Sequence, residues 1–228
     1  MDSNHTPQCA TCPFPISERY CRKPKGKGPA SCPSLNKRHL RDAAQEEYRT
    51  KFAEFARQAT IQESVGYDRS SGSYETLKPV KPRIVEVVEF AHRMNYKKLA
   101  LIFCNGLRQE ARIVNEIMEI NGFEMVSMIC KVGRLPKEEL GIEAQDQLEA
   151  CAPESACNPI MQALIANEQE VDFNILLGLC VGHDSMAIKY LEAPTTILAV
   201  KDRQLGHNPL VAVNMYDSYY RYLKQPLP

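Results

Sequence analysis

A chain of 228 residues is long enough for one domain of ordinary size plus an appended segment, and it can bury a core without disulfide bonds. Its 28 basic and 28 acidic side chains cancel, so the composition shows no basic nucleic-acid-binding face. No apolar run reaches the ~18–20 residues of a membrane span, and the first residues lack the apolar core of a signal peptide. We therefore expect a cytoplasmic protein with neither a nucleic-acid nor a membrane partner.

The nine cysteines are the most informative part of the composition. A reducing cytoplasm keeps thiols free, so a cysteine-rich cytoplasmic chain indicates metal binding or catalysis before disulfide bonding. Nine is an odd number, which excludes complete pairing of the cysteines within the chain.

Residues 1–34 differ in character from the rest, because they are rich in proline, glycine and cysteine. Four cysteines follow the spacing C-x2-C-x8-C-x10-C, and they are Cys9, Cys12, Cys21 and Cys32. The close pair suits two-thiolate binding to one metal, and the other two complete a four-sulfur set for zinc or a four-iron cluster. A metal would explain how a segment almost without apolar residues folds. The alternative is a disordered tail with free thiols.

Residues 35–78 are predicted to form a helix followed by a linker. Apolar positions recur at spacings of three and four over 35–63, which is typical of one amphipathic helix. The stretch 66–82 is polar and contains many turn-forming residues.

The region 79–228 shows a regular alternation. Helical patterns alternate with four short apolar runs, at 97–104, 123–130, 171–180 and 194–200. Such alternation predicts an α/β domain: an open, mostly parallel sheet of at least four strands covered by helices, similar to a Rossmann fold. A last helix is expected over 212–225, with its tyrosines packed on the sheet or on a partner.

Cysteines recur at the ends of these runs. Cys104, Cys130 and Cys180 end the first three runs, and Cys157 directly precedes a helix. In open parallel sheets the carboxyl ends of the strands share one edge, where ligands bind, so we expect these four thiols to meet there. The alternative is that they are small core residues. Cys151 has no comparable position.

Soft thiolates select iron–sulfur clusters, zinc or copper(I). Four thiolates would close a structural site, whereas three would leave one metal position open for a substrate. The cations Lys131, Lys201 and Arg203 would offset thiolate charge or hold an anionic substrate, unless they form a solvated rim. His183 and His207 are candidates for ligands, proton donors or plain hydrogen-bonding residues.

Two aspartates near the histidines have expected roles. Asp184 precedes a helical pattern and is expected to cap that helix. Asp202 is expected to orient His207 or to pair with Arg203.

Five motifs carry a family resemblance: "FCNGLRQEA", "CKVG", "CNPIMQA", "GLCVGHDS" and "VKDRQLGHNP". In this order they resemble a family of small bacterial and archaeal proteins that are described as metal-binding and share domain of unknown function eighteen forty-seven. The resemblance spans nearly the whole chain, including its cysteine-rich start. It implies metal binding without a settled reaction, and it supports Cys104, Cys130, Cys157 and Cys180 as the motif cysteines.

Three functions remain open at this point. The first is an enzyme of sulfur or redox chemistry that acts through a metal, with an iron–sulfur cluster favoured, on a small anionic or sulfur-bearing molecule. The second is a non-enzymatic redox or metal carrier or sensor, which would have an electron-transfer partner. The third is a metal-free enzyme with a cysteine nucleophile beside His183.

Overall fold

The computed structural model describes residues 6–70, 72–148 and 154–227, which fall into two units, Met1–Ser64 and Val65–Pro228. Within these described ranges, no helix is both long enough and apolar enough to cross a membrane. Cys151 lies outside the described residues.

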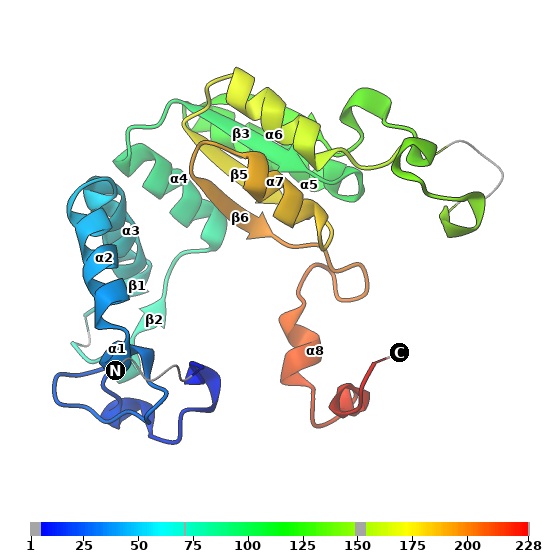
Figure 1. Ribbon diagram of the computed structural model, residues 1–228. Helices are drawn as coiled ribbons and strands as arrows, with labels where there is room; N and C mark the ends of the chain where they lie inside the picture. Colours follow the sequence, from blue (N-terminus) through cyan, green and yellow to red (C-terminus); the bar gives the residue numbers. More distant parts are fainter. Residues whose placement is uncertain (1–5, 71, 149–153, 228) are drawn as a thin grey trace. The chain divides into compact units, whose positions relative to one another are not determined.

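The second unit is built on a four-stranded sheet with the order β4-β3-β5-β6 (Figure 1). Every neighbouring pair of strands is parallel. The strands are β3 (Lys98–Phe103), β4 (Glu124–Ile129), β5 (Phe173–Leu177) and β6 (Thr195–Ala199). The predicted open parallel α/β sheet is therefore confirmed.

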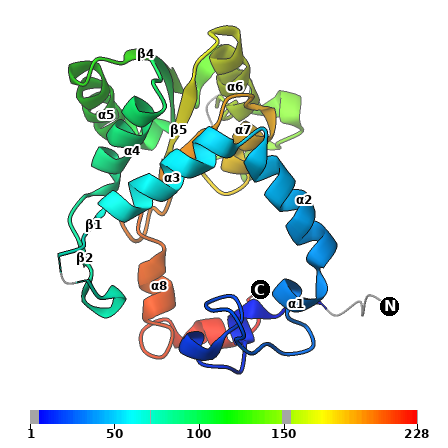
Figure 2. The ribbon, with the colours of Figure 1, turned by 90° about the vertical axis from the view of Figure 1, so that its left-hand side faces the viewer.

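Helices cover both faces of this sheet. They are α4 (Arg83–Arg93), α5 (Arg108–Ile120), α6 (Pro159–Glu168) and α7 (His183–Tyr190). Figure 2 shows α4 and α5 on one face, with α6 and α7 on the other. All five residues of β5 are buried, which is why this strand is a continuous apolar run with a single polar residue, Asn174. Gly122, with φ of 86°, follows the end of α5, where a left-handed residue closes the helix.

The connections change direction between β3 and β5. The chain leaves β3 through α5 toward β4 on one side, and it leaves β5 through α7 toward β6 on the other side. Neighbouring strands whose connections diverge in this way open a crevice at their carboxyl ends, and ligands bind there in this class of fold.

The single helix predicted over 35–63 is wrong. The structure has three pieces instead, α1 (Pro33–Asn36), α2 (Arg38–Arg49) and α3 (Ala53–Val65). The second break follows Arg49, where Thr50 leaves the helical conformation and its hydroxyl donates to the Glu46 carbonyl at 2.8 Å. Such a bond from threonine back to the preceding turn competes with helix continuation.

The predicted linker over 66–82 contains a short antiparallel pair, β1 (Tyr67–Asp68) with β2 (Lys78–Pro79). The helix predicted over 212–225 is wrong, since only α8 (Leu210–Asn214) and a final 3-10 turn form. Aromatic side chains and the Asp-Ser pair in this stretch favour helix poorly. Three of its four tyrosines are exposed, Tyr219 to 82%, so these three do not pack on the sheet, and packing on a partner stays a prediction.

Single 3-10 turns complete the structure. They are η1 (Cys9–Thr11), η2 (Ile16–Glu18), η3 (Tyr74–Thr76), η4 (Asn105–Leu107), η5 (Val132–Arg134), η6 (Lys137–Leu140), η7 (Ala144–Asp146) and η8 (Arg221–Lys224).

Candidate functional site

Four cysteine thiols from four separate segments converge at the carboxyl edge of the sheet. Cys104 and Cys130 directly follow β3 and β4, and both are buried. The Cys130 thiol interacts with the thiols of Cys104 and Cys157, and Cys180 lies near enough to influence the charge on Cys157. Cys180 lies three residues beyond β5, so it belongs to the loop before α7. We call these four residues the sheet-edge cysteines.

Cys157 reaches this edge because the long excursion after β4 is closed at its base. The Lys137 backbone N–H donates to the Glu154 carbonyl at 3.1 Å, and the side chains of the same two residues form an ion pair. The Asn158 N–H then donates to the Cys130 carbonyl at 2.7 Å. These bonds return the chain to the end of β4, which places Cys157 beside Cys130.

Backbone N–H groups of η4 point at two of the sulfurs. The Asn105 N–H donates to Cys130 Sγ at 3.3 Å, and the Gly106 N–H donates to Cys104. A side chain at residue 106 would be obstructed, because its Cβ would lie 2.9 Å from Lys201 Nζ. Neither Asn105 nor Gly106 was predicted as a site residue, although they are the two residues that follow Cys104.

The three predicted cations each lie by a different cysteine. Arg203 Nη2 donates to Cys180 Sγ at 3.0 Å. Lys201 and Lys131 lie close enough to lower the pKa of Cys104 and Cys157, respectively. Lys131 also donates to the Ser155 carbonyl, so it helps to close the excursion that carries Cys157.

The sheet-edge thiols shift one another's pKa values. The hydrogen bond to Cys130, together with burial, raises the pKa of Cys104 to about 12. For Cys130, the bond with Cys104 lowers the pKa, but the bond with Cys157 and burial raise it overall. The Cys130 hydrogen bond and the nearby Lys131 lower the pKa of Cys157 to about 7. Of these three thiols, Cys157 is therefore the most readily ionised in the absence of metal.

His207 is held in one tautomer. Its Nδ1 accepts a hydrogen bond from the Asp202 backbone N–H at 3.1 Å, so in the neutral ring Nε2 carries the proton. Asp202 thus orients His207 through its backbone, while its carboxylate accepts from the N–H groups of Gln204 and Leu205. In this arrangement His207 is a hydrogen-bond donor and has no free lone pair for a metal.

His183 and Asp184 lie in the first turn of α7. Within the described ranges the His183 imidazole makes no hydrogen bond or ion pair, and its backbone N–H donates to the Cys180 carbonyl at 3.0 Å. The prediction that Asp184 is the N-cap is wrong, because Gly182 occupies that position. The Asp184 carboxylate reaches back to the Gly182 N–H at 3.1 Å, since a short side chain inside the first turn can satisfy these free donors.

Two polar residues of the α6 segment escaped prediction. Asn158 caps α6 by accepting the Met161 N–H at 3.0 Å. Gln162 is completely buried and donates to the carbonyls of Phe103 and Met128 at 3.2 and 2.7 Å. The only signal in the sequence is a single glutamine within the apolar run "PIMQALIA".

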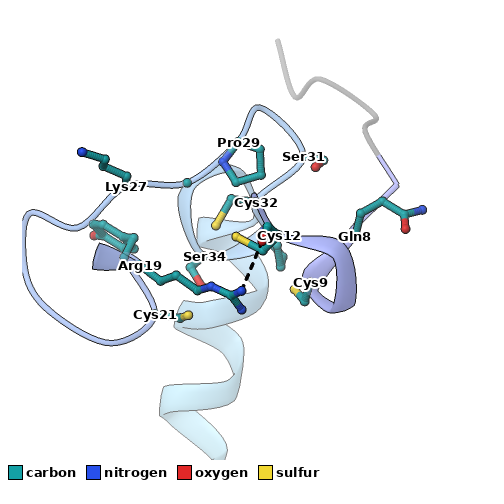
Figure 3. A pocket seen from close by; sticks show the side chains of 13 residues that line it. Gln8, Cys9, Cys12, Arg19, Cys21, Lys27, Pro29, Ser31, Cys32 and Ser34 are labelled. Carbon is teal, nitrogen blue, oxygen red and sulfur yellow. Dashed lines mark hydrogen bonds between the residues drawn. The ribbon is translucent and has the colours of Figure 1, made fainter. Parts of the chain in front are cut away.

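The four N-terminal cysteines line one pocket of about 40 Å³ in the first unit (Figure 3). The first pair lies on a tight turn in which the Cys12 N–H donates to the Cys9 carbonyl at 3.4 Å. Arg19 holds the residues after this turn in place, because its guanidinium donates to the carbonyls of Phe14 and Cys12 at 2.7 and 3.2 Å. An ordered water needs roughly 10–15 Å³, so this pocket has room for a bound ion.

Burial of apolar side chains contributes little to the stability of this first unit. Among the described residues, every buried apolar side chain belongs to the second unit, the first of them being Val87. Glycine is required where the chain folds back, because a Cβ at Gly26 would collide with the Arg19 backbone and one at Gly28 would lie 2.9 Å from Cys32 Sγ. The cysteine-bearing part of this unit is therefore a series of close turns, and no described residue of the unit has a fully buried apolar side chain.

Neither cysteine group is preassembled as a metal-ligand cage. In the part of the chain that the structure describes, no three His, Cys, Asp or Glu side chains have the mutual geometry of metal ligands. The donor chemistry nevertheless fits a thiophilic metal at both places, since each brings four cysteines together.

Fold and site together define a thiol-rich α/β protein. The chain belongs to the family described as "Protein of unknown function (DUF1847)", whose model matches residues 32–198. It is 44% identical over 140 residues to "Uncharacterized protein MJ0455" of Methanocaldococcus jannaschii, an alignment that covers 61% of this chain and 69% of the relative. No solved structure matches the chain.

The match to the family confirms the resemblance seen in the motifs, but its extent is narrower than expected. The matched range includes the sheet-edge cysteines and, of the N-terminal set, only Cys32. It ends before Lys201, Arg203 and His207.

Proposed function

We propose that this chain is a cytoplasmic metalloprotein of redox or sulfur chemistry, with an iron–sulfur cluster, most simply a four-iron cluster, bound at the sheet edge. The supporting observation is the convergence of Cys104, Cys130, Cys157 and Cys180 at the switch point of a parallel sheet. Cysteines that only packed in the core would not need to bring four thiols from four segments to one edge beside three cations.

The surroundings of the sulfurs suit a metal-bound state. Backbone N–H groups donate to Cys130 and Cys104, and donors of this kind stabilise thiolates and tune the potential of a cluster. A bound cluster would supply one-electron transfer, or a Lewis-acidic iron if one position is left to a substrate. Metal binding would replace the hydrogen bonds between thiols and release their protons, so uptake would be favoured as pH rises.

The outer face of the site suits an anionic molecule. Cys180 is half-buried, and the next residue, Val181, is 93% exposed, so this side of the site meets solvent. Arg203 is held there on Cys180, and Lys201 lies deeper, by Cys104. We propose that the two cations bind a small anionic or sulfur-bearing substrate and that His207 Nε2–H donates a hydrogen bond to it.

For the N-terminal pocket we propose a single zinc ion bound by Cys9, Cys12, Cys21 and Cys32. The supporting observations are that four cysteines, the ligand set of a structural zinc site, line one pocket and that no described residue of this unit has a fully buried apolar side chain. In small modules of this kind the free energy of metal binding is also the free energy of folding.

A metal-free enzyme with Cys180 as nucleophile and His183 as base receives less support. Among the described residues, the hydrogen bond to Cys180 Sγ comes from Arg203, and the His183 imidazole has no bond to it. A carrier or sensor would keep the metal but would not need Lys201 and Arg203 to bind a substrate, so binding of small anions separates it from an enzyme.

The proposal is tested by purifying the chain without oxygen and measuring iron, zinc, acid-labile sulfide and visible absorption. We expect one iron–sulfur cluster and about one zinc per chain. Cys130→Ser should remove the iron and its absorption, and Cys12→Ser should remove only the zinc. A colourless protein whose metal content does not change in Cys130→Ser would contradict the sheet-edge centre.

A further inference from the structure

We infer that Gln162 is a positioning residue that sets the spacing of the sheet-edge thiols. The inference rests on the proposed function, since it assumes that these thiols act as one site. It concerns a residue that contacts none of the proposed chemistry and acts through the backbone that carries the ligands.

The side chain of Gln162 joins three of the segments that carry the cysteines. Its Nε2 donates to the carbonyl of Phe103, the residue before Cys104, and to the carbonyl of Met128, two residues before Cys130. Gln162 itself lies in α6, the helix that begins two residues after Cys157. One amide group therefore connects the ends of β3 and β4 to this helix.

The two carbonyls lie on neighbouring strands, one residue apart in register. Phe103 pairs with Ile129 in the β3–β4 register, and Ile102 pairs with Met128. An NH2 group that donates to both strands holds their ends at a set separation, just below the point where Cys104 and Cys130 leave the sheet. The distance between these two sulfurs follows from that separation.

Burying an amide side chain at this position is energetically unfavourable. Gln162 is completely buried, and its Oε1 has no hydrogen-bond partner among the described residues. Its neighbours on the buried side of α6 include Ala163 and Ala166, so an apolar side chain would suit the surroundings. A buried acceptor without a partner is unfavourable, which indicates that the two donated bonds are the reason for the glutamine.

Asn174 provides a matched control within the same sheet. It is also completely buried, donates its amide to a backbone carbonyl (Ala193, 3.0 Å), and has an Oδ1 without a partner among the described residues. It lies near the start of β5, however, and pairs with the start of β6, at the opposite edge from the cysteines. Removing either amide disturbs the core comparably, but only Gln162 lies under the thiols.

The test compares Gln162→Met, which keeps length without donors, with Asn174→Leu in the protein as purified. Iodoacetamide labelling is followed peptide by peptide at Cys104 and Cys130, and metal release to a chelator is followed on the same samples. We expect Gln162→Met to speed labelling of both thiols, and any metal release, by about tenfold or more, the usual effect of losing support behind a ligand. Asn174→Leu should change both rates less than about twofold.

Equal effects of the two variants, or no effect of Gln162→Met, would overturn the inference. Gln162→Glu is the second variant, since it keeps the shape and loses the NH2 group. If both Gln162 variants unfold while Asn174→Leu folds, the residue holds the whole sheet together, and a role specific to the thiols is refuted. If the wild type holds no metal at the sheet edge, the proposed function fails, while the labelling rates still decide the role of Gln162.

Discussion

Replacing Gly106 by alanine tests whether the backbone of η4 leaves room for Lys201 beside the thiols. The added Cβ would lie 2.9 Å from Lys201 Nζ, where ordinary contacts are about 3.5 Å or longer. Gly106 does not have a positive φ, so alanine adopts its backbone conformation without strain. The flexible end of Lys201 must therefore move away from Cys104, at a cost in folding stability below the ~1–3 kcal/mol of overpacking a rigid core.

The loss of metal-binding free energy should be larger than this loss of folding stability. Lys201 lowers the pKa of Cys104, so its displacement disfavours the thiolate that a metal requires. Loss of such outer support typically weakens metal binding about 10–100-fold, which corresponds to roughly 1.4–2.7 kcal/mol.

The assay is a double-mutant cycle with a chromophoric chelator as competitor. Gly106→Ala, Lys201→Ala and the double variant are compared in a Cys9→Ser and Cys12→Ser background, which confines metal to the sheet edge. We expect each single variant to bind metal about tenfold or more weakly, and the double variant to equal Lys201→Ala. Additive losses would refute the reasoning, because the methyl group would then act on something other than Lys201.

Three further outcomes follow from the same structure. In metal-free protein the pKa of Cys157 is lowered to about 7, so the stability that its thiolate contributes is complete above about pH 9 and is lost as pH falls through 7. The urea concentration at the midpoint of unfolding should therefore rise from pH 7 to pH 9. A flat or falling profile would contradict this. Asn158→Ala removes the cap of α6 and should lower stability by about 1 kcal/mol, or Tm by roughly 2–4 °C by calorimetry, whereas an unchanged Tm would exclude the cap. Lys137→Met removes the cation from Glu154, whose side chain is only 15% exposed, and should lower the free energy of unfolding by roughly 1–3 kcal/mol. It should also speed alkylation of Cys157. An unchanged alkylation rate would show that the ion pair does not position Cys157.

The alternation of apolar runs and helices predicted the sheet because buried parallel strands are nearly continuous in apolar residues. β5 is such a strand, buried along its whole length. The strand order was not predictable, since it depends on which face each helix covers. The breaks at Thr50 and after Asn214 escaped prediction because they arise from local bonds and turns within segments of helical pattern.

The candidate site was predictable where it follows from topology. Cys104 and Cys130 come together because they follow adjacent parallel strands. The position of Cys157 depends on bonds between Lys137 and Glu154, seventeen residues apart, which no periodicity reveals. The role of Gln162 depends on carbonyls from two distant strands, so the sequence shows only a polar residue in an apolar helix.

The most direct test of the central claim is the number of iron atoms bound by Cys130→Ser compared with Cys32→Ser after anaerobic purification. Cys130 is the thiol that interacts with both Cys104 and Cys157, whereas Cys32 belongs to the N-terminal pocket. We predict that Cys130→Ser loses the iron and Cys32→Ser retains it. Full iron in Cys130→Ser would contradict a metal centre at the sheet edge.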